Sequence, residues 1–399
     1  MGDVGAVVAA IITIATGLFV IDLVPLQENM VCLGNYSNAS TCPDVFFSQT
    51  FQGAREKFVN AAQKAKAELQ RHVIVQWEGV DYTMDTAFIR GKNAKRLLIH
   101  LSGSDGVGGF SSSAVQTKLL SEWNASRADG PSVLFLHAVN PYGMAFYQIG
   151  NENNVELHRN YLSPEDWKAV HLEQSRNTDI EDALKLLYLP QAPRVIDRYL
   201  LFFRFAKVFF THGWSIFWKM VEKGQRRDAV GVFYGGQEEQ RSISVLREVL
   251  RQYTTGGVEA FVFIDVRTGS GTVGRETIFT STAQDETLAK SIFTSTVVLR
   301  PNGGANASSM GRIRPVDILS TGNHSLLVEE VFSTTNLPFM IRSALLSNGA
   351  LRHAKGSYVH MMMQQWMRDA HAPQTINYKK DVLRRGEETF NAAWNHLLR

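Results

Sequence analysis

RLLIHLSGSDGVGGFSSSAVQ, residues 96–116, joins a mostly apolar run to a cluster of glycines and a run of serines. Leu97–Leu101 predicts a buried strand, and Gly103–Gly109 predicts a turn that leads into a helix. Strand ends and exposed helix N–H groups converge at such a junction, so α/β proteins place functional groups there. Asp105 is the one ionisable side chain in this turn.

The rest of the body alternates short apolar runs with amphipathic, helix-like patterns. Strands are predicted at Val73–Trp77, Asp85–Ile89, Val133–Val139, Val258–Val266 and Leu326–Phe332. Helices are predicted at Phe47–His72, Ser112–Trp123, Arg241–Tyr253 and Asn377–Leu398. Buried strands that are separated by helices indicate an α/β protein with a largely parallel sheet, covered on both faces.

The segment Ile196–Val221, IDRYLLFFRFAKVFFTHGWSIFWKMV, is rich in aromatic residues. Its charges, which include Asp197, Arg204 and Lys207, make a bilayer-spanning helix unfavourable. Two interpretations remain: a long helix packed on the sheet, or an aromatic face that lies on a membrane or on a partner subunit.

Composition limits the class of partner. The chain has 399 residues, 44% of them hydrophobic, and a formal net charge of +3. No run of Lys or Arg is longer than a pair such as Arg226-Arg227. This pattern gives no electrostatic support for nucleic-acid binding, and we expect no nucleic-acid partner.

The N-terminal region, residues 1–26, contains eighteen uncharged residues at Val4–Ile21. As a helix they would span roughly 27 Å, close to the thickness of a bilayer core. A cleaved signal peptide would have a positive N-terminal region, where this chain has Asp3, and a buried Ala-rich helix is a further alternative. We expect an N-terminal membrane helix that anchors the protein.

Both cysteines, Cys32 and Cys42, lie in the linker formed by residues 27–44. Two cysteines that close a short loop predict a disulfide in an oxidising compartment, and two unpaired thiols are the alternative. Together with the expected anchor, they predict a single-pass membrane protein. Its body, residues 45–399, would lie in the secretory lumen, outside the cell or in the mitochondrial intermembrane space.

Four motifs follow one another in a characteristic order, and they extend over most of the body. They are TAFIRGKNAKRLLIHLSGSDGVGGFSSSAVQ, LFLHAVNPYGMAFYQIGNENNVELHRNYL, GVFYGG and VFIDVRTGSG. In this order they resemble the zinc-carboxypeptidase-like domain family, long catalogued as of unknown function. The resemblance implies a carboxypeptidase-like α/β/α sandwich with a mixed, mostly parallel central sheet.

The chemistry of that family needs three protein ligands on one zinc ion, with water completing the coordination. The resemblance places the first His ligand at Asp105, the Glu ligand at Gly108 and the second His ligand at Arg267. Glycine has no ligand atom, and arginine offers only hydrogen-bond donors. We therefore expect zinc to be lost, with no metal site, no cofactor and no catalytic residue.

Two other functional residues of the family match positions that are altered or uncertain in this chain. An ungapped match puts the proton-transferring Glu at Val331, and Glu330 is one residue away, on the opposite face of a strand unless a bulge intervenes. Arg159 matches the arginine that binds a substrate's terminal carboxylate, and His158 replaces the Asn beside it. A structural ion pair is the alternative for Arg159.

Loss of the metal would leave Asp105 desolvated and unpaired, which costs free energy. We therefore expect Arg267 to lie within about 4 Å of Asp105 as an ion pair. The alternative is that both side chains face solvent.

These patterns favour a protein without catalysis over an enzyme. The first hypothesis is a membrane-anchored protein that acts as a structural or binding module. A subunit of a membrane complex, with protein partners, is one form of this hypothesis. The second is a working hydrolase that recruits ligands from elsewhere or uses Ser102 or Ser104, although neither serine lies in a Gly-x-Ser-x-Gly elbow. The third is a carboxylate-binding receptor that keeps Arg159.

Overall fold

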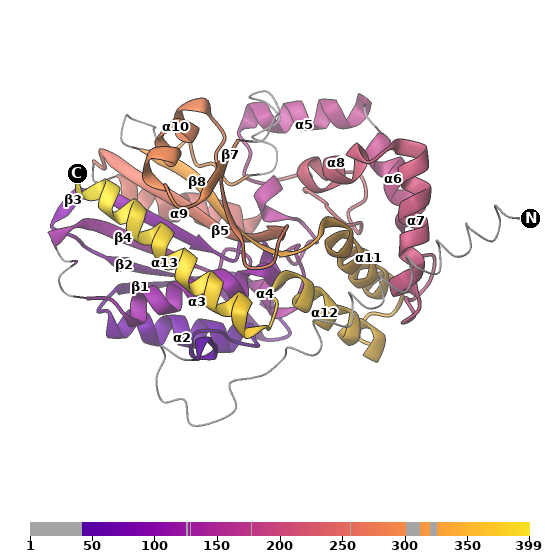
Figure 1. Cartoon of the computed structure of the whole chain (residues 1–399), viewed down its shortest axis with the longest axis horizontal. Coiled ribbons are helices and arrows are strands. Elements are labelled where there is room, and N and C mark those ends of the chain that lie inside the picture. The colour runs from indigo at the N-terminus through magenta and orange to yellow at the C-terminus, as the bar shows by residue number, and fades with distance from the viewer. Residues whose placement is uncertain are drawn as a thin grey trace, which may run out of the picture.

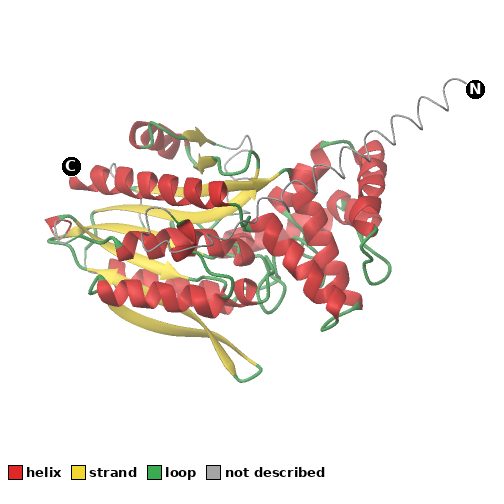
Figure 2. Ribbon diagram, turned by 60° about the horizontal axis from the view of Figure 1, so that its bottom comes forward, coloured by secondary structure: helices red, strands yellow, loops and turns green. Residues whose placement is uncertain are grey.

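A computed structural model describes residues 42–124, 127, 129–176, 178–255, 257–300, 312–319 and 325–399. A twisted sheet covered by helices forms one part of the molecule, and a separate group of helices packs beside it (Figure 1). The two parts are also distinct when the molecule is turned (Figure 2).

The sheet has eight strands in the order β1-β2-β4-β3-β5-β8-β6-β7. Their bounds are β1 Glu68–Trp77, β2 Val80–Ile89, β3 Asn93–Ser102, β4 Pro131–His137, β5 Ala260–Ser270, β6 Glu276–Phe279, β7 Val297–Leu299 and β8 Leu326–Thr335. The four central strands β4, β3, β5 and β8 are parallel, whereas β2 pairs antiparallel with β1 and β4, and β6 pairs antiparallel with β8 and parallel with β7. The sheet is therefore mixed and mostly parallel, as expected.

Helices cover both faces of the sheet. One core contains side chains of α2 (Phe51–Lys64), α3 (Gly109–Ser121), α10 (Ala283–Ile292) and α13 (Ile376–Leu398). The opposite face packs against α9 (Arg241–Thr254). The central strands are apolar because both of their faces are buried in this way.

The second part of the molecule is a helical cluster with a core of its own. It contains α6 (Asp179–Leu187), α7 (Asp197–His212), α8 (Ser215–Lys223), α11 (Leu337–His353) and α12 (Tyr358–His371). The other elements are η1 (Pro43–Val45), η2 (Gly106–Gly108), α4 (Pro141–Ala145), η4 (Leu157–Arg159) and α5 (Pro164–Arg176).

Two predicted helices were wrong in extent. The helix expected at Phe47–His72 ends at Lys64, because residues from Glu68 onward pair with β2. The helix expected at Ile196–Val221 is a helical hairpin, since α7 ends at Gly213, whose φ of +78° is a left-handed conformation that glycine adopts readily.

The predicted localisation also needs correction. Among residues 42–399, apart from the gaps given above, no helix is both long and apolar enough to cross a membrane. This finding contradicts a single-pass membrane protein with its body in an oxidising compartment. The Val4–Ile21 segment itself lies outside the described residues. So does Cys32, and its pairing with the buried Cys42 stays a prediction.

Candidate functional site

The candidate site lies where β3, β5 and β8 end beside one another. Because these strands are parallel, their carboxyl ends meet at one edge of the sheet. The turn after β3 requires glycine at Gly103 and Gly106, which have φ values of +70° and +62°. This turn brings Asp105 next to the end of β5.

Asp105 is buried, and it faces the backbone at the end of β5. Its Oδ2 atom accepts hydrogen bonds from the amide and the hydroxyl of Thr268, each at 2.9 Å. Its Oδ1 atom has no hydrogen-bond partner among the described residues. Burial raises the pKa of Asp105, although the charge of Arg267 and the Thr268 donors act in the opposite direction.

Gly108 provides the space that this arrangement needs. A Cβ atom at Gly108 would lie 2.0 Å from Asp105 Oδ2 and 2.2 Å from Thr268 Oγ1. A side chain at position 108 and the observed position of the Asp105 carboxylate therefore exclude each other. The replacements at these two ligand positions are physically coupled.

The variant Gly108→Ala tests this coupling. Gly108 has helical backbone angles, so alanine alone would be expected to stabilise the fold slightly. We expect instead a loss of about 1–3 kcal/mol in the free energy of unfolding, measured with urea, because the methyl group is forced against Asp105 and Thr268. Gly53→Ala, within helix α2, is the control and should show no such loss.

The double variant Asp105→Ala/Gly108→Ala should recover part of the loss, since one of the two clashing atoms has been removed. A Gly108→Ala protein as stable as the parent would contradict this explanation.

Arg267 pairs with a different carboxylate from the one expected. Its Nη1 atom lies 3.2 Å from Oε1 of Glu329, and the other oxygen of Glu329 lies 3.1 Å from Nη1 of Arg312. No ion pair within 4.0 Å joins Arg267 to Asp105, so that prediction was wrong. In the β5–β8 register Asp265 lies opposite Glu329, which places Arg267 diagonally across from Glu329 on the same face.

Asp265 is a second buried carboxyl group on this face. Its Oδ1 atom accepts a hydrogen bond of 2.7 Å from Ser104, while Oδ2 has no partner in the described chain. Burial raises the pKa of Asp265 to about 7, although Arg267 partly offsets this effect. Despite the cost of burial, the carboxylates of Glu329, Asp265 and Asp105 raise the pKa of Arg267.

Arg159, the expected carboxylate clamp, is engaged in internal contacts. It is 1% exposed, and its Nε atom lies 2.7 Å from Glu156 Oε2. Its Nη1 atom donates to the carbonyl of Glu222 at 2.6 Å, and Nη2 donates to the carbonyl of Val221. This is the structural ion pair that was the alternative reading. Each guanidinium nitrogen of Arg159 therefore makes an internal hydrogen bond or ion pair.

His158 lies between the acid and the arginines of this cluster. Its Nε2 atom is 3.5 Å from Glu156 Oε2, and its Nδ1 atom has no partner in the described residues. Burial, followed by the charges of Arg267, Arg159 and Arg312, holds the pKa of His158 well below its ordinary value. His158 is therefore neutral at physiological pH.

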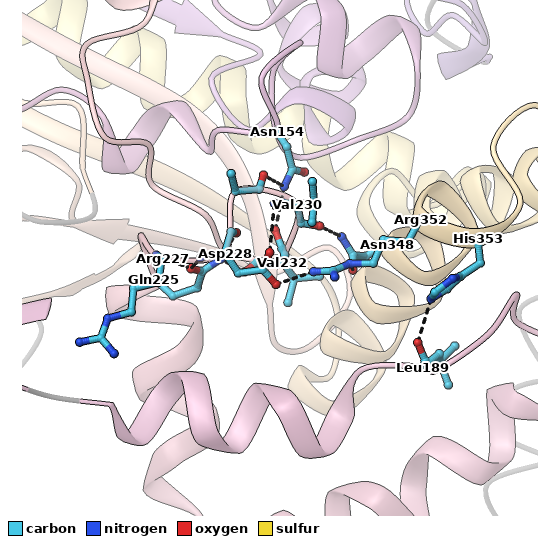
Figure 3. A network of polar contacts seen from close by, with 12 residues as sticks. Asn154, Leu189, Gln225, Arg227, Asp228, Val230, Val232, Asn348, Arg352 and His353 are labelled. Carbon is cyan, nitrogen blue, oxygen red and sulfur yellow. Dashed lines mark hydrogen bonds and ion pairs between the residues drawn. The ribbon is translucent and has the colours of Figure 1, made fainter. Parts of the chain in front are cut away.

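The loop that contains the GVFYGG motif is fixed against α11 by a polar network (Figure 3). Asn154 donates to the carbonyls of Ala229 and Gly231, and Asn348 donates to the carbonyl of Val230 at 2.6 Å. Arg352 pairs with Asp228 at 2.5 Å.

A cavity of about 40 Å³ lies between this loop, Glu156 and α11. It has room for roughly three water molecules.

The serines considered as nucleophiles are buried and have no histidine beside them. Ser102 and Ser104 are fully buried, and they bond to Gln116 and Asp265 respectively. A serine nucleophile needs an adjacent general base, usually histidine, and a path for the substrate. Ser113 does contact His137 at 2.8 Å, but both side chains lie inside the core.

The positions matched to the proton-transferring Glu differ in orientation. Glu330 points to the opposite face of β8, where it interacts with Glu276, so it lies outside the cluster. Val331 is aliphatic and lies opposite Arg267. Glu329 is two residues from Val331 and therefore shares its face, a spacing in the sequence that could have identified it.

The donor set does not fit a zinc ion. Asp105 has the only coordinating side chain of the three matched positions. Gly108 has no side chain, and Arg267 brings a permanent positive charge. Within the part of the chain that the structure describes, no group of three or more His, Cys, Asp or Glu residues could hold a metal ion.

Comparisons with known proteins were made on sequence and on structure. No curated protein matches the sequence. Similar solved structures include bovine thrombin-activatable fibrinolysis inhibitor in complex with tick carboxypeptidase inhibitor, at 9% identity over 86% of this chain and 99% of that chain, with a TM-score of 0.41. Carboxypeptidase A from Helicoverpa armigera matches at 8% identity over 88% and 82%, with a TM-score of 0.44.

A metallo-carboxypeptidase from Burkholderia cenocepacia matches at 12% identity over 79% and 68%, with a TM-score of 0.38. The family expected from the four motifs is confirmed by a match that covers residues 47–385. The chain therefore belongs to the family described as "Protein of unknown function (DUF2817)".

Proposed function

We propose that this carboxypeptidase-like protein has no peptidase activity and acts as a structural or binding module. One observation carries the proposal: Arg267, at a matched metal-ligand position, forms a largely buried ion pair with Glu329. A guanidinium group stays protonated in proteins and has no lone pair to offer a metal. Its charge would also repel a divalent cation.

The cluster supports a structural role for the altered site. Glu329 lies between Arg267 and Arg312, with 8% of its side chain exposed. Arg159 and Glu156 hold the end of α8 through the bonds to Val221 and Glu222. Arg267 thus joins β5 to β8, and Arg159 separately joins the segment around Glu156 to α8; neither connection depends on a metal ion.

Metal analysis and a peptidase assay test the proposal. Purified protein that has been incubated with Zn²⁺ and then desalted should contain well below one zinc ion per chain. It should not hydrolyse peptides that have a free C-terminus, whereas a zinc carboxypeptidase treated in parallel should do both. Bound zinc together with peptide turnover would overturn the proposal.

A further inference from the structure

The exposed aromatic side chains are concentrated on one helical hairpin. We call residues 197–223, which form α7 and α8, the aromatic hairpin. In the described chain, every Phe or Trp that is exposed lies on it: Phe203 (58%), Phe209 (44%), Phe210 (82%), Trp214 (49%) and Trp218 (43%). Contiguous apolar patches on a protein surface mark binding sites.

An apolar pocket of about 310 Å³ opens beside these aromatic residues. Its walls come from Phe205 and Phe209 of α7, Trp214 just before α8, and Leu337 and Phe339 at the start of α11. Every side chain that lines it is apolar. The volume is at the lower end of the range for small-molecule sites.

The lining determines which part of a ligand can enter. Apart from the indole N–H of Trp214, the side chains here offer no hydrogen-bond donor or acceptor, so a polar group would be desolvated with little compensation. The pocket therefore suits a hydrocarbon group.

The charged residues near the pocket indicate the chemistry of the ligand's polar end. No Asp or Glu occurs between Arg198 and Val221. Lys207 directly follows the pocket-lining Ala206 and is exposed, and its ammonium group has no ion-pair or hydrogen-bond partner among the residues the structure describes. An unpaired lysine without a neighbouring acid on its helix favours an anionic head group.

We propose that this pocket binds the acyl chain of a free fatty acid. The hydrocarbon chain lies between α7, α8 and the start of α11, and the carboxylate stays in water near Lys207. This site is separate from the cluster around Arg267, and its test does not depend on the absence of peptidase activity.

Fatty acids from octanoate to palmitate, and their brominated analogues, are the probes. Affinity should rise by about fourfold with each added methylene and then level off once the pocket is filled. Brominated chains should quench tryptophan fluorescence in the parent, and much less in Trp214→Phe.

A matched pair of variants tests the location of the site. Ala206 is exposed and lines the pocket, so Ala206→Trp should fill it and weaken binding at least about tenfold. Thr211→Trp places the same side chain at another exposed position of α7, one that does not line the pocket, and should bind as the parent does. Thermal unfolding of both variants confirms that they are folded.

Two binding experiments distinguish a free fatty acid from a phospholipid as the source of the acyl chain. Binding of monomeric fatty acid alone identifies a free acid. Binding to phosphatidylglycerol-containing vesicles that is lost in Ala206→Trp, without any binding of monomeric fatty acid, identifies a phospholipid and overturns the proposal. Equal affinity in Ala206→Trp and Thr211→Trp, or affinity that does not depend on chain length, would overturn the proposal. So would a dimer, detected by light scattering, that Ala206→Trp dissociates while fatty-acid binding is absent.

Discussion

Replacement of Arg267 by methionine is expected to lower the free energy of unfolding by about 3–5 kcal/mol. Only 13% of the Arg267 side chain is exposed, and its guanidinium pairs with a Glu329 that is more deeply buried. Removing Arg267 takes away one of two cationic partners of Glu329 and leaves Arg312 to compensate a poorly solvated carboxylate. Asp105 and Asp265 would lose the same counter-charge. Urea denaturation at neutral pH measures the loss.

Two companion variants separate this effect from a simple change of side chain. Arg384→Met removes an arginine that pairs with Glu388 on the exposed face of α13, where both side chains are about half exposed, so it should cost less than about 1 kcal/mol. The double variant Arg267→Met/Glu329→Leu should lose less stability than the sum of the losses of its two single variants, because both substitutions remove the same ion pair. Equal losses for Arg267→Met and Arg384→Met would show that the pair contributes little.

The sequence predicts the central part of the sheet well, and physical reasons explain this success. The runs in β3, β4 and β5 are apolar because both faces of these strands are buried, a pattern that few other structures produce. The end of α2 was predicted less well, since the residues before β1 continue a helix-like spacing. The strands β6 and β7 have four and three residues, too short for a periodic pattern.

The positions of the site were predictable, but their pairing was not. The motifs placed Asp105, Gly108 and Arg267 at neighbouring strand ends, where the structure has them. Asp105 nevertheless bonds to the backbone amide of Thr268, a donor that side-chain chemistry alone does not reveal.

The partners of Arg267 are also distant in the sequence. Glu329 lies on β8, the strand beside β5, and Arg312 belongs to a separate short segment between β7 and β8. Neither contact follows from local spacing.

A second pair of buried carboxyl groups predicts how stability depends on pH. Glu330 of β8 and Glu276 of β6 interact in the core beneath α13, where Thr389 donates to Glu276 at 2.5 Å. Burial and then the negative charge of Glu276 raise the pKa of Glu330 well above its ordinary value. The folded state therefore binds more protons than the unfolded state above about pH 4, and stability falls as the pH rises toward the raised pKa.

Glu330→Gln should remove most of this dependence. One proton taken up on folding corresponds to a slope of about 1.4 kcal/mol per pH unit, so the variant should lose up to that slope between about pH 5 and pH 8. It should become more stable than the parent at the upper end of this range, where the parent must bury a second carboxylate beside Glu276. Urea denaturation across the range, with Glu248→Gln on the exposed side of α9 as the control for net charge, measures both effects.

Asp265 makes a second contribution to the pH dependence of stability, and this contribution can be measured separately. Its pKa of about 7 also makes the folded state bind an extra proton, so stability falls between about pH 4 and pH 7 in its case as well. Asp265 and Glu330 face opposite sides of the sheet, and Asp265→Asn should therefore change the slope independently of Glu330→Gln. If the slope for Glu330→Gln equalled that of the parent throughout the range, Glu330 would be ionised in the folded protein, and the carboxyl pair could not share a proton.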